Sequence, residues 1–136
     1  MTGRWTRRAL LSGGGGSGFA QAPFGVAART FPDMQWATIG HLQRDWHATD
    51  PGNITHHGWI DAPELWLAAA DLVVSSAGNS TCAQVLSAGV PWIVVPEWRY
   101  FDEQVCKARA LAAAGVAHCE PHLPSSAQAW RRAVRA

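Results

Sequence analysis

The chain has 136 residues, the usual size of one domain, and its 48% content of hydrophobic residues is sufficient for a core. Its 11 basic and 10 acidic side chains give a formal net charge of +1, which excludes a field strong enough to attract nucleic acid or an anionic membrane. No segment approaches the about 20 consecutive apolar residues of a membrane span. The sequence therefore predicts one globular domain over residues 1–136.

Six short apolar runs alternate with helix-like segments, which is the pattern of β-α-β units on a parallel sheet. The runs at 72–75 and 92–95 are continuously apolar, as expected for central strands that are buried on both faces. The predicted strands are Ala9–Ser12, Trp36–Ile39, Ile54–His57, Leu72–Ser75, Trp92–Val95 and Val116–Cys119. We therefore expect an α/β fold, with a Rossmann-like parallel sheet of about six strands and helices on both faces.

Helices are predicted between and after these strands. The segment Ser80–Ala88 has apolar residues at helical spacing, with Asn79 or Ser80 available as the N-cap and Gly89 as the terminating residue. The other predictions are a helix that Asp102 caps and Gly115 ends, a closing helix over Ser125–Ala136, and a loop over the polar segment His41–Asn53.

The glycine-rich run from Gly13 to Gly18 follows the first predicted strand and precedes a presumed helix. Glycines let the backbone approach a ligand closely, and free amides at a helix N-terminus favour phosphate oxygens. The run fits GxGxxG, but the acidic residue that would bind an NAD ribose is missing, because Ile39–Leu42 occupies its place. A P-loop is excluded since no Gly-Lys-Ser/Thr follows. A phosphate site and a plain flexible turn both remain open.

Two further polar segments follow predicted strands. Gly78 permits a tight turn after the strand at 72–75, and Asn79–Thr81 offer uncharged hydrogen bonds to an anion, although alone they are a simple helix cap. Asp102 and Gln104 follow the strand at 92–95 and can bond hydroxyl groups, although alone Asp102 is also a cap. Loops that follow parallel strands emerge at one edge of the sheet, so we expect all three segments to converge there.

The cysteines and histidines do not indicate a metal site. Cys82, Cys106 and Cys119 lack CxxC or metal-ligand spacing, so we expect reduced thiols, as in cytosolic proteins. His56 and His57 are adjacent in a predicted strand, where neighbouring side chains point to opposite faces and cannot easily hold one ion. The sequence thus predicts no metal and no cofactor.

The order and spacing of these segments resemble the donor-binding half of GT-B glycosyltransferases, and especially the MurG-type N-acetylglucosaminyltransferases of peptidoglycan synthesis and their relatives. The likeness extends over nearly the whole chain. It is carried by Leu72–Gly78, Ala88-Gly89-Val90-Pro91, Val94-Val95-Pro96 and Asp102-Glu103-Gln104. The resemblance implies a domain that binds a nucleoside-diphosphate sugar, a UDP-sugar in particular, for transfer of a hexosyl group to an acceptor hydroxyl.

The resemblance also implies roles for individual residues. It assigns the donor diphosphate to Gly14, Gly15, Gly16, Ser17, Gly18, Gly78, Asn79, Ser80 and Thr81. The main chain of Ile60 would hold the base, Gln84 the ribose, and Asp102 and Gln104 the transferred sugar. Gln84 stands where the family usually has a glutamate, and Ser76 stands where many members have a histidine or an arginine. The choice of nucleotide is therefore open.

The implied reaction is displacement of a nucleoside diphosphate from the sugar C1 by an acceptor hydroxyl. Preorganised amides can stabilise the leaving diphosphate without a metal, whereas the general base is expected in an acceptor-binding domain or subunit that this sequence lacks. We therefore expect binding without turnover, and we expect Trp59, Trp66 and Trp98 to face the cleft toward that missing half. The implied location is the cytoplasm, with the missing half able to bring the protein to the inner face of the membrane.

Two other functions compete with this interpretation. A nucleotide-sugar epimerase half has a similar Ser-x-Gly turn, but its usual paired carboxylates are absent from Cys82-Ala83-Gln84. A non-catalytic nucleotide-binding module, or a split subunit of a transferase, would carry the same motifs. A neighbouring reading frame that encodes a membrane-associated α/β domain would favour the split enzyme.

Overall fold

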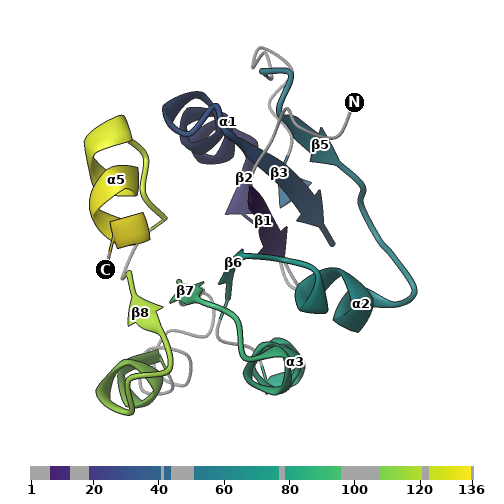
Figure 1. Ribbon diagram of the computed structural model, residues 1–136, viewed down its shortest axis with the longest axis vertical. Helices are drawn as coiled ribbons and strands as arrows, with labels where there is room; N and C mark the ends of the chain where they lie inside the picture. The colour runs from purple at the N-terminus through teal and green to yellow at the C-terminus, as the bar shows by residue number, and fades with distance from the viewer. Residues whose placement is uncertain are drawn as a thin grey trace.

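The computed structural model describes residues 7–12, 19–40, 42–43, 51–76, 79–95, 108–120 and 123–135. One sheet has the strand order β5-β3-β1-β6-β7-β8, and all of its pairings are parallel (Figure 1). Its strands are β1 (Arg7–Ser12), β3 (Met34–Ile39), β5 (Ile54–His56), β6 (Leu72–Ser75), β7 (Trp92–Val94) and β8 (His118–Cys119). The predicted α/β fold with a six-stranded parallel sheet is confirmed.

Strand β1 is the point at which the order of the sheet reverses. It pairs with β3 on one side and with β6 on the other, so the chain moves outward first through β3 and β5 and later through β6, β7 and β8. The last residues of β1 and β6, Ser12 and Ser75, are partners in the register. In open α/β sheets such a reversal leaves a crevice at the carboxyl ends of the strands, where ligands bind.

Helices cover both faces of the sheet. Figure 1 shows α1 (Gln21–Thr30) and α5 (Ala127–Arg135) on one side, and α2 (Pro63–Ala68) and α3 (Asn79–Ala88) on the other. A further helical segment at residues 108–113 contributes Ala108 to the layer that α2 and α3 cover. Because each connection crosses to the next parallel strand over one face, the reversal at β1 distributes the helices to both faces.

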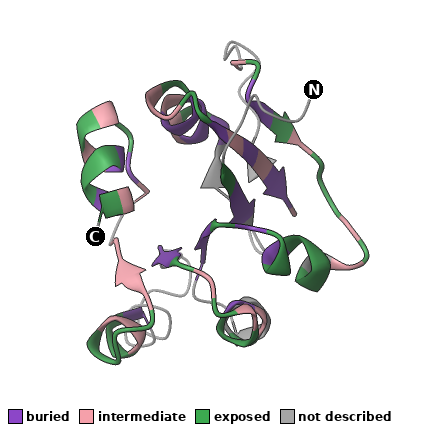
Figure 2. Ribbon diagram, viewed as in Figure 1, coloured by how far each residue is buried: buried purple, intermediate pink, exposed green. Residues whose placement is uncertain are grey.

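The core is divided into two layers by the sheet, and Figure 2 shows the buried strands between helices with exposed outer surfaces. The α1/α5 core consists of Ala9, Leu11, Phe24, Ala27, Ala28, Met34, Trp36, Ile54, Leu72, Val74, Ile93, Val95, Trp130 and Ala133. The α2/α3 core consists of Leu10, Ile39, Leu67, Ala70, Val73, Val85, Trp92, Val94 and Ala108. Successive residues of a strand enter different layers, as for Leu10 and Leu11, because side chains alternate across a strand.

Two tryptophans join the elements of the α1/α5 core. The rings of Trp36 and Trp130 lie 5.9 Å apart at 75°, an edge-to-face arrangement that aromatic pairs favour. The indole N–H of Trp130 donates a hydrogen bond of 3.0 Å to the Pro23 carbonyl, which ties α5 to α1. Because both side chains are 0% exposed, they fill the space between the sheet and its two helices.

The predicted elements agree with the structure except at their ends and in short segments. All six strands are present, although β8 has only two residues where four were predicted. Helix α3 begins at Asn79, one residue early, and α5 begins at Ala127, where the Ser126 hydroxyl accepts a hydrogen bond from the Ala129 amide. Gly89 and Gly115 have φ angles of 68° and 76°, which confirms that they end their helices.

The prediction of a loop over His41–Asn53 is wrong at two residues. Strand β4 (Leu42–Gln43) pairs in parallel with β2 (Phe19–Ala20) and forms a second, two-stranded sheet. Helix α2 is also present in a segment for which no helix was predicted. Strands of two residues and a helix of six are too short to show a hydrophobic period, so only pairing and packing reveal them.

A buried asparagine joins α1 to the strands beside it. The Asn53 side-chain amide donates to the carbonyls of Ala28, Phe31 and Met34 at 2.9, 3.2 and 2.9 Å. The main-chain carbonyl of Asn53 accepts a hydrogen bond of 2.7 Å from the Trp36 main-chain amide. Carbonyls at the end of α1 and the start of β3 are thereby satisfied by one side chain that directly precedes β5.

We predict that Asn53→Ala lowers the free energy of unfolding by about 1–3 kcal/mol, because the carbonyls of Ala28, Phe31 and Met34 each lose a hydrogen bond, although that of Phe31 still accepts one from the Met34 amide. Urea denaturation measures this loss. Gly52→Ala is the matched control, since a Cβ at Gly52 meets no atom within 4 Å, and it should change stability by less than about 0.5 kcal/mol. Equal effects of the two substitutions would contradict the bridging role of Asn53.

Candidate functional site

The carboxyl ends of β1 and β6 lie side by side and define the candidate site. The glycine run Gly13–Gly18 continues the chain from the end of β1, and α3 begins at Asn79, shortly after the end of β6. The first amides of a helix have no partner within the helix and carry partial positive charge. The α3 N-terminus is therefore suited to an anion at the reversal point of the sheet.

The structure describes some of the predicted site residues. Ile60 and Gln84 are described in full, whereas Asn79, Ser80 and Thr81 are described as the backbone of the first turn of α3. The others lie outside the described residues; they are Gly14, Gly15, Gly16, Ser17, Gly18, Gly78, Asp102 and Gln104.

Ile60 follows β5 and turns its side chain inward. The side chain is half-buried and packs against the α2/α3 core. Within the described ranges, no backbone hydrogen bond is found for its N–H or C=O group. The preceding turn is set by Gly58, with φ 70°, whose carbonyl accepts a 2.7 Å hydrogen bond from the amide of Gly40, with φ 80°. The Ile60 side chain therefore belongs to the core, and the binding of a base by its main chain stays a prediction.

Gln84 lies on the second turn of α3. Its side chain is half-buried, and the next residue, Val85, is in the α2/α3 core. Residues three and four apart share one face of a helix, so position 84 is on the same face as Ser80 and Thr81. The predicted ribose ligand is therefore one helical turn from the predicted diphosphate ligands.

A buried hydrogen-bonded group lies at the carboxyl end of β6, shortly before α3 begins. The indole N–H of Trp92 donates to the Ser75 hydroxyl at 2.8 Å, and that hydroxyl donates to the Ser76 carbonyl at 2.9 Å. All three residues are buried. The sequence predicts Trp92 only as part of a strand. The signal for this contact was the pair of serines at the end of a buried strand, because buried hydroxyls are almost always hydrogen-bonded.

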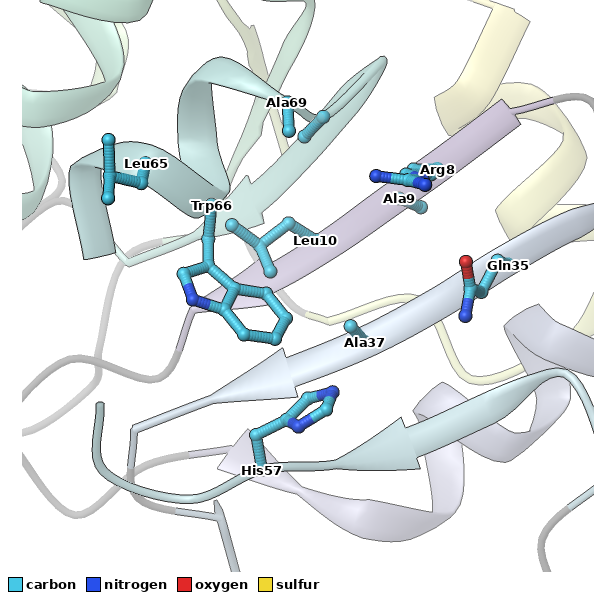
Figure 3. A pocket seen from close by; sticks show the side chains of 10 residues that line it. Arg8, Ala9, Leu10, Gln35, Ala37, His57, Leu65, Trp66 and Ala69 are labelled. Carbon is cyan, nitrogen blue, oxygen red and sulfur yellow. The ribbon is translucent and has the colours of Figure 1, made fainter. Parts of the chain in front are cut away.

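A cavity of about 420 Å³ lies elsewhere, between α2 and the surface of β1 and β3. Arg8 and Gln35 stand toward one end, His57 and Trp66 stand at the other, and Leu10 and Ala37 form the floor (Figure 3). The His57 and Trp66 rings are 4.6 Å apart. Neither Ile60 nor Gln84, the two predicted site residues that are described in full, lines this cavity.

The described tryptophans divide into two groups. Trp36, Trp92 and Trp130 are in the core, whereas Trp59 is 78% exposed and Trp66 is 37% exposed. Core filling and surface exposure thus both occur among the described tryptophans. That Trp59, Trp66 and Trp98 face another domain stays a prediction, and Trp98 lies outside the described residues.

The histidines and the described cysteine have structural surroundings. His56 Nδ1 lies 2.8 Å from the Thr38 hydroxyl, while His57 contacts Trp66, so the two rings have different partners. Burial raises the pKa of the Cys119 thiol, the Glu120 carboxylate raises it further, and Arg109 partly opposes the increase. The thiol is therefore neutral at pH 7 and a weak nucleophile.

The described residues show neither a metal-binding cluster nor a membrane-spanning helix. This part of the chain contains no group of three or more His, Cys, Asp or Glu side chains that could hold a metal ion. It also contains no helix with the length and apolar character needed to cross a membrane.

This chain has the fold of about one third of each of two larger solved chains. The match to the crystal structure of the glycotransferase of kitacinnamycin covers 97% of this chain and 34% of that chain, with 24% identity and a TM-score of 0.72. The match to the spinosyn rhamnosyltransferase SpnG complexed with thymidine diphosphate covers 95% of this chain and 36% of that chain, with 23% identity and a TM-score of 0.72. These likenesses establish the fold that the chain shares with glycosyltransferases.

Sequence relatives agree with this. Over 69 residues the chain is 44% identical to the UDP-N-acetylglucosamine--N-acetylmuramyl-(pentapeptide) pyrophosphoryl-undecaprenol N-acetylglucosamine transferase of Clavibacter michiganensis subsp. michiganensis (strain NCPPB 382), which covers 49% of this chain and 19% of that protein. The transferase of the same name from Moorella thermoacetica (strain ATCC 39073 / JCM 9320) is 43% identical over 67 residues, covering 48% and 18%. The chain spans about a fifth of the length of these relatives.

The family model for the glycosyltransferase family 28 C-terminal domain matches residues 41–121. The matched region extends from the end of β3 to the end of β8, and so includes α3 and the strands on both sides of it. This chain therefore belongs to the glycosyltransferase family 28 C-terminal domain family.

Proposed function

We propose that this chain binds a nucleoside-diphosphate sugar, with a UDP-sugar as the preferred donor, and serves as the donor-binding half of a glycosyltransferase that transfers a hexosyl group to an acceptor hydroxyl. One observation carries the proposal: the sheet order β5-β3-β1-β6-β7 arranges the segments that follow these strands in the order of the parts of such a donor. Ile60 follows β5, the glycine run and the α3 N-terminus follow β1 and β6, and Asp102 follows β7. Base, diphosphate and sugar would lie along one edge.

The diphosphate would bind at the reversal point of the sheet. Gly14, Gly15, Gly16, Ser17 and Gly18 would offer amides without side-chain obstruction, and Gly78 to Thr81 would add the first amides of α3. The helix dipole places about half a positive charge at that end. The proposal is supported by the named relative SpnG, whose structure contains thymidine diphosphate.

The base and the ribose would bind beside this point. The Ile60 main chain would hold the edge of the base, and the ring of Trp59, which is 78% exposed, is available to stack on it. Gln84 would bond the ribose hydroxyls from one turn along α3. The uracil preference is supported by the names of the relatives, which are UDP-N-acetylglucosamine transferases.

In the reaction, the acceptor hydroxyl attacks C1 of the sugar and the nucleoside diphosphate leaves. The amides that hold the diphosphate would stabilise its growing negative charge, which is the contribution of this half. Asp102 and Gln104 would orient the sugar through its hydroxyls. The general base would come from an acceptor-binding domain or subunit, so the chain alone would bind donor without transferring the sugar. A cytoplasmic location at the inner face of the membrane would suit an acceptor such as the undecaprenol-linked one in the names of the relatives.

Calorimetric titration of the chain with UDP, TDP, GDP and NAD tests the proposal directly. We expect saturable binding of a nucleoside diphosphate, tightest for UDP, and at least about a tenfold loss in Gly16→Val, because the new side chain blocks close approach of the phosphate. Gly52→Ala, which meets open space, should bind like the unchanged chain. A preference for NAD, or no binding of any nucleotide, would contradict the proposal.

Gln84→Glu should tighten UDP binding about three- to tenfold, since a carboxylate accepts stronger hydrogen bonds from the ribose hydroxyls than an amide oxygen does. The same titration with 2′-deoxy-UDP isolates this contact, and there the gain should be smaller. Gln128→Glu, on the exposed surface of α5, adds the same charge away from the site and should leave affinity unchanged. A gain that is equal for UDP and 2′-deoxy-UDP would rule out the ribose contact.

Trp59→Ser should weaken UDP binding by about five- to a hundredfold if its ring stacks on the base, a range that corresponds to the usual energy of base–aromatic stacking. Because Trp59 is exposed, the melting temperature should not change. Leu65→Ser removes another exposed apolar side chain, at the start of α2, and serves as the control. Equal losses of affinity in both variants would show that Trp59 has no particular role.

A further inference from the structure

We propose that Trp92 is a positioning residue for the diphosphate end of this site: through the Ser75 hydroxyl, its indole N–H holds the peptide of Ser76, three residues before the start of α3. The inference rests on the proposed function, because the site in question is the diphosphate site at the α3 N-terminus. It is carried by the buried hydrogen bonds of Trp92, Ser75 and Ser76.

The register of β6 and β7 brings these side chains together. Val73 is the partner of Trp92, and Ser75 is the partner of Val94, so Trp92 and Ser75 are diagonal neighbours on adjacent strands. Diagonal neighbours on one face are within reach of an aromatic side chain. The indole N–H extends along the sheet and donates to the Ser75 hydroxyl oxygen at 2.8 Å.

The hydroxyl of Ser75 links the Trp92 indole to the main chain of Ser76. It accepts from Trp92 and donates to the Ser76 carbonyl at 2.9 Å, while the Ser75 carbonyl accepts a 2.8 Å hydrogen bond from the Val95 amide. Ser75 is 0% exposed, so no water competes for these groups. A buried chain in which one hydroxyl both accepts and donates is stronger than two separate bonds.

The fixed peptide of Ser76 is close to α3. Asn79 is three residues further along, so its Cα can be no more than about 11 Å from that of Ser76. The direction in which the chain leaves Ser76 therefore limits where the first amides of α3 point. The Trp92 ring belongs to the same α2/α3 core as Val85 of α3, so one side chain supports both the end of β6 and the helix.

Trp130 provides a matched comparison within the same chain. Its side chain is buried, and its indole N–H also donates one hydrogen bond, to the Pro23 carbonyl at 3.0 Å. It lies in the α1/α5 core, on the opposite face of the sheet from Trp92. Replacement by Phe removes the indole N–H in either position and retains an aromatic ring, so a purely structural role predicts the same consequences for both.

The experiment compares Trp92→Phe, Ser75→Ala, the double variant and Trp130→Phe by calorimetric titration with UDP and by thermal melting. We expect Trp92→Phe to raise the Kd for UDP about three- to tenfold, as the loss of one positioning hydrogen bond would. Ser75→Ala should raise it at least as much, and the double variant no further, because the two groups act through one path. Trp130→Phe should lower the melting temperature similarly but keep the Kd within about twofold.

The ¹⁵N order parameters of the amides of Ser76 and the first turn of α3 give a second readout, and they should fall in Trp92→Phe but not in Trp130→Phe. Since Trp92→Phe retains the Ser75 hydroxyl, the test holds even if Ser75→Ala does not fold. An unchanged chain that binds UDP, together with a Trp92→Phe variant of equal Kd and equal order parameters, overturns the positioning role alone. Absence of UDP binding by the unchanged chain overturns the proposed function and, with it, the assignment of a ligand to this turn.

Discussion

The pairing of β1 with both β3 and β6 is the constraint on which the rest of the structure depends. It forces the earlier strands to one side and the later strands to the other, so crossovers of one hand place α1 on one face and α2 and α3 on the opposite face. It also brings the ends of β1 and β6 together with no helix between them. The core and the candidate site therefore depend on the same strand. Strand β1 is central in the sheet that separates the two core layers, and it ends at the candidate diphosphate site.

The two core layers are built differently. In the α1/α5 core, Trp36 and Trp130 meet edge to face, and Trp130 and Asn53 connect helices and strands through hydrogen bonds to carbonyls. In the α2/α3 core, Trp92 makes the corresponding bond, but its acceptor is the hydroxyl at the end of β6. The N–H of the buried Trp36 indole has no hydrogen-bond partner among the described residues, whereas that of Trp92 is bonded to the Ser75 hydroxyl at the end of β6. In the proposed positioning role of Trp92, packing on this face would influence the main chain at the end of β6.

The candidate site combines main-chain groups with few charges. With a formal net charge of +1 for the whole chain, attraction of a diphosphate has to be local, and helix amides at the reversal point provide it in the proposed mode of binding. The two fully described residues of the predicted site add no charge, because Ile60 is apolar and packs against the core, and Gln84 is uncharged. The cavity beside α2, with Arg8 and Gln35 at one end and Trp66 at the other, is lined by neither Ile60 nor Gln84.

The sequence by itself determined the fold class, all six strands of the main sheet and the helix ends at Gly89 and Gly115, because continuous apolar runs and glycines with positive φ are local signals. The motif around Gly78 was also sufficient to indicate the family. Only the tertiary structure decided what depends on neighbours distant in the sequence: the pairing of β4 with β2, the three carbonyls bound by Asn53, and the contact of Trp92 with Ser75. It also decided how far each tryptophan is buried, because Trp36 at 0% and Trp59 at 78% exposure differ in what distant elements pack against them.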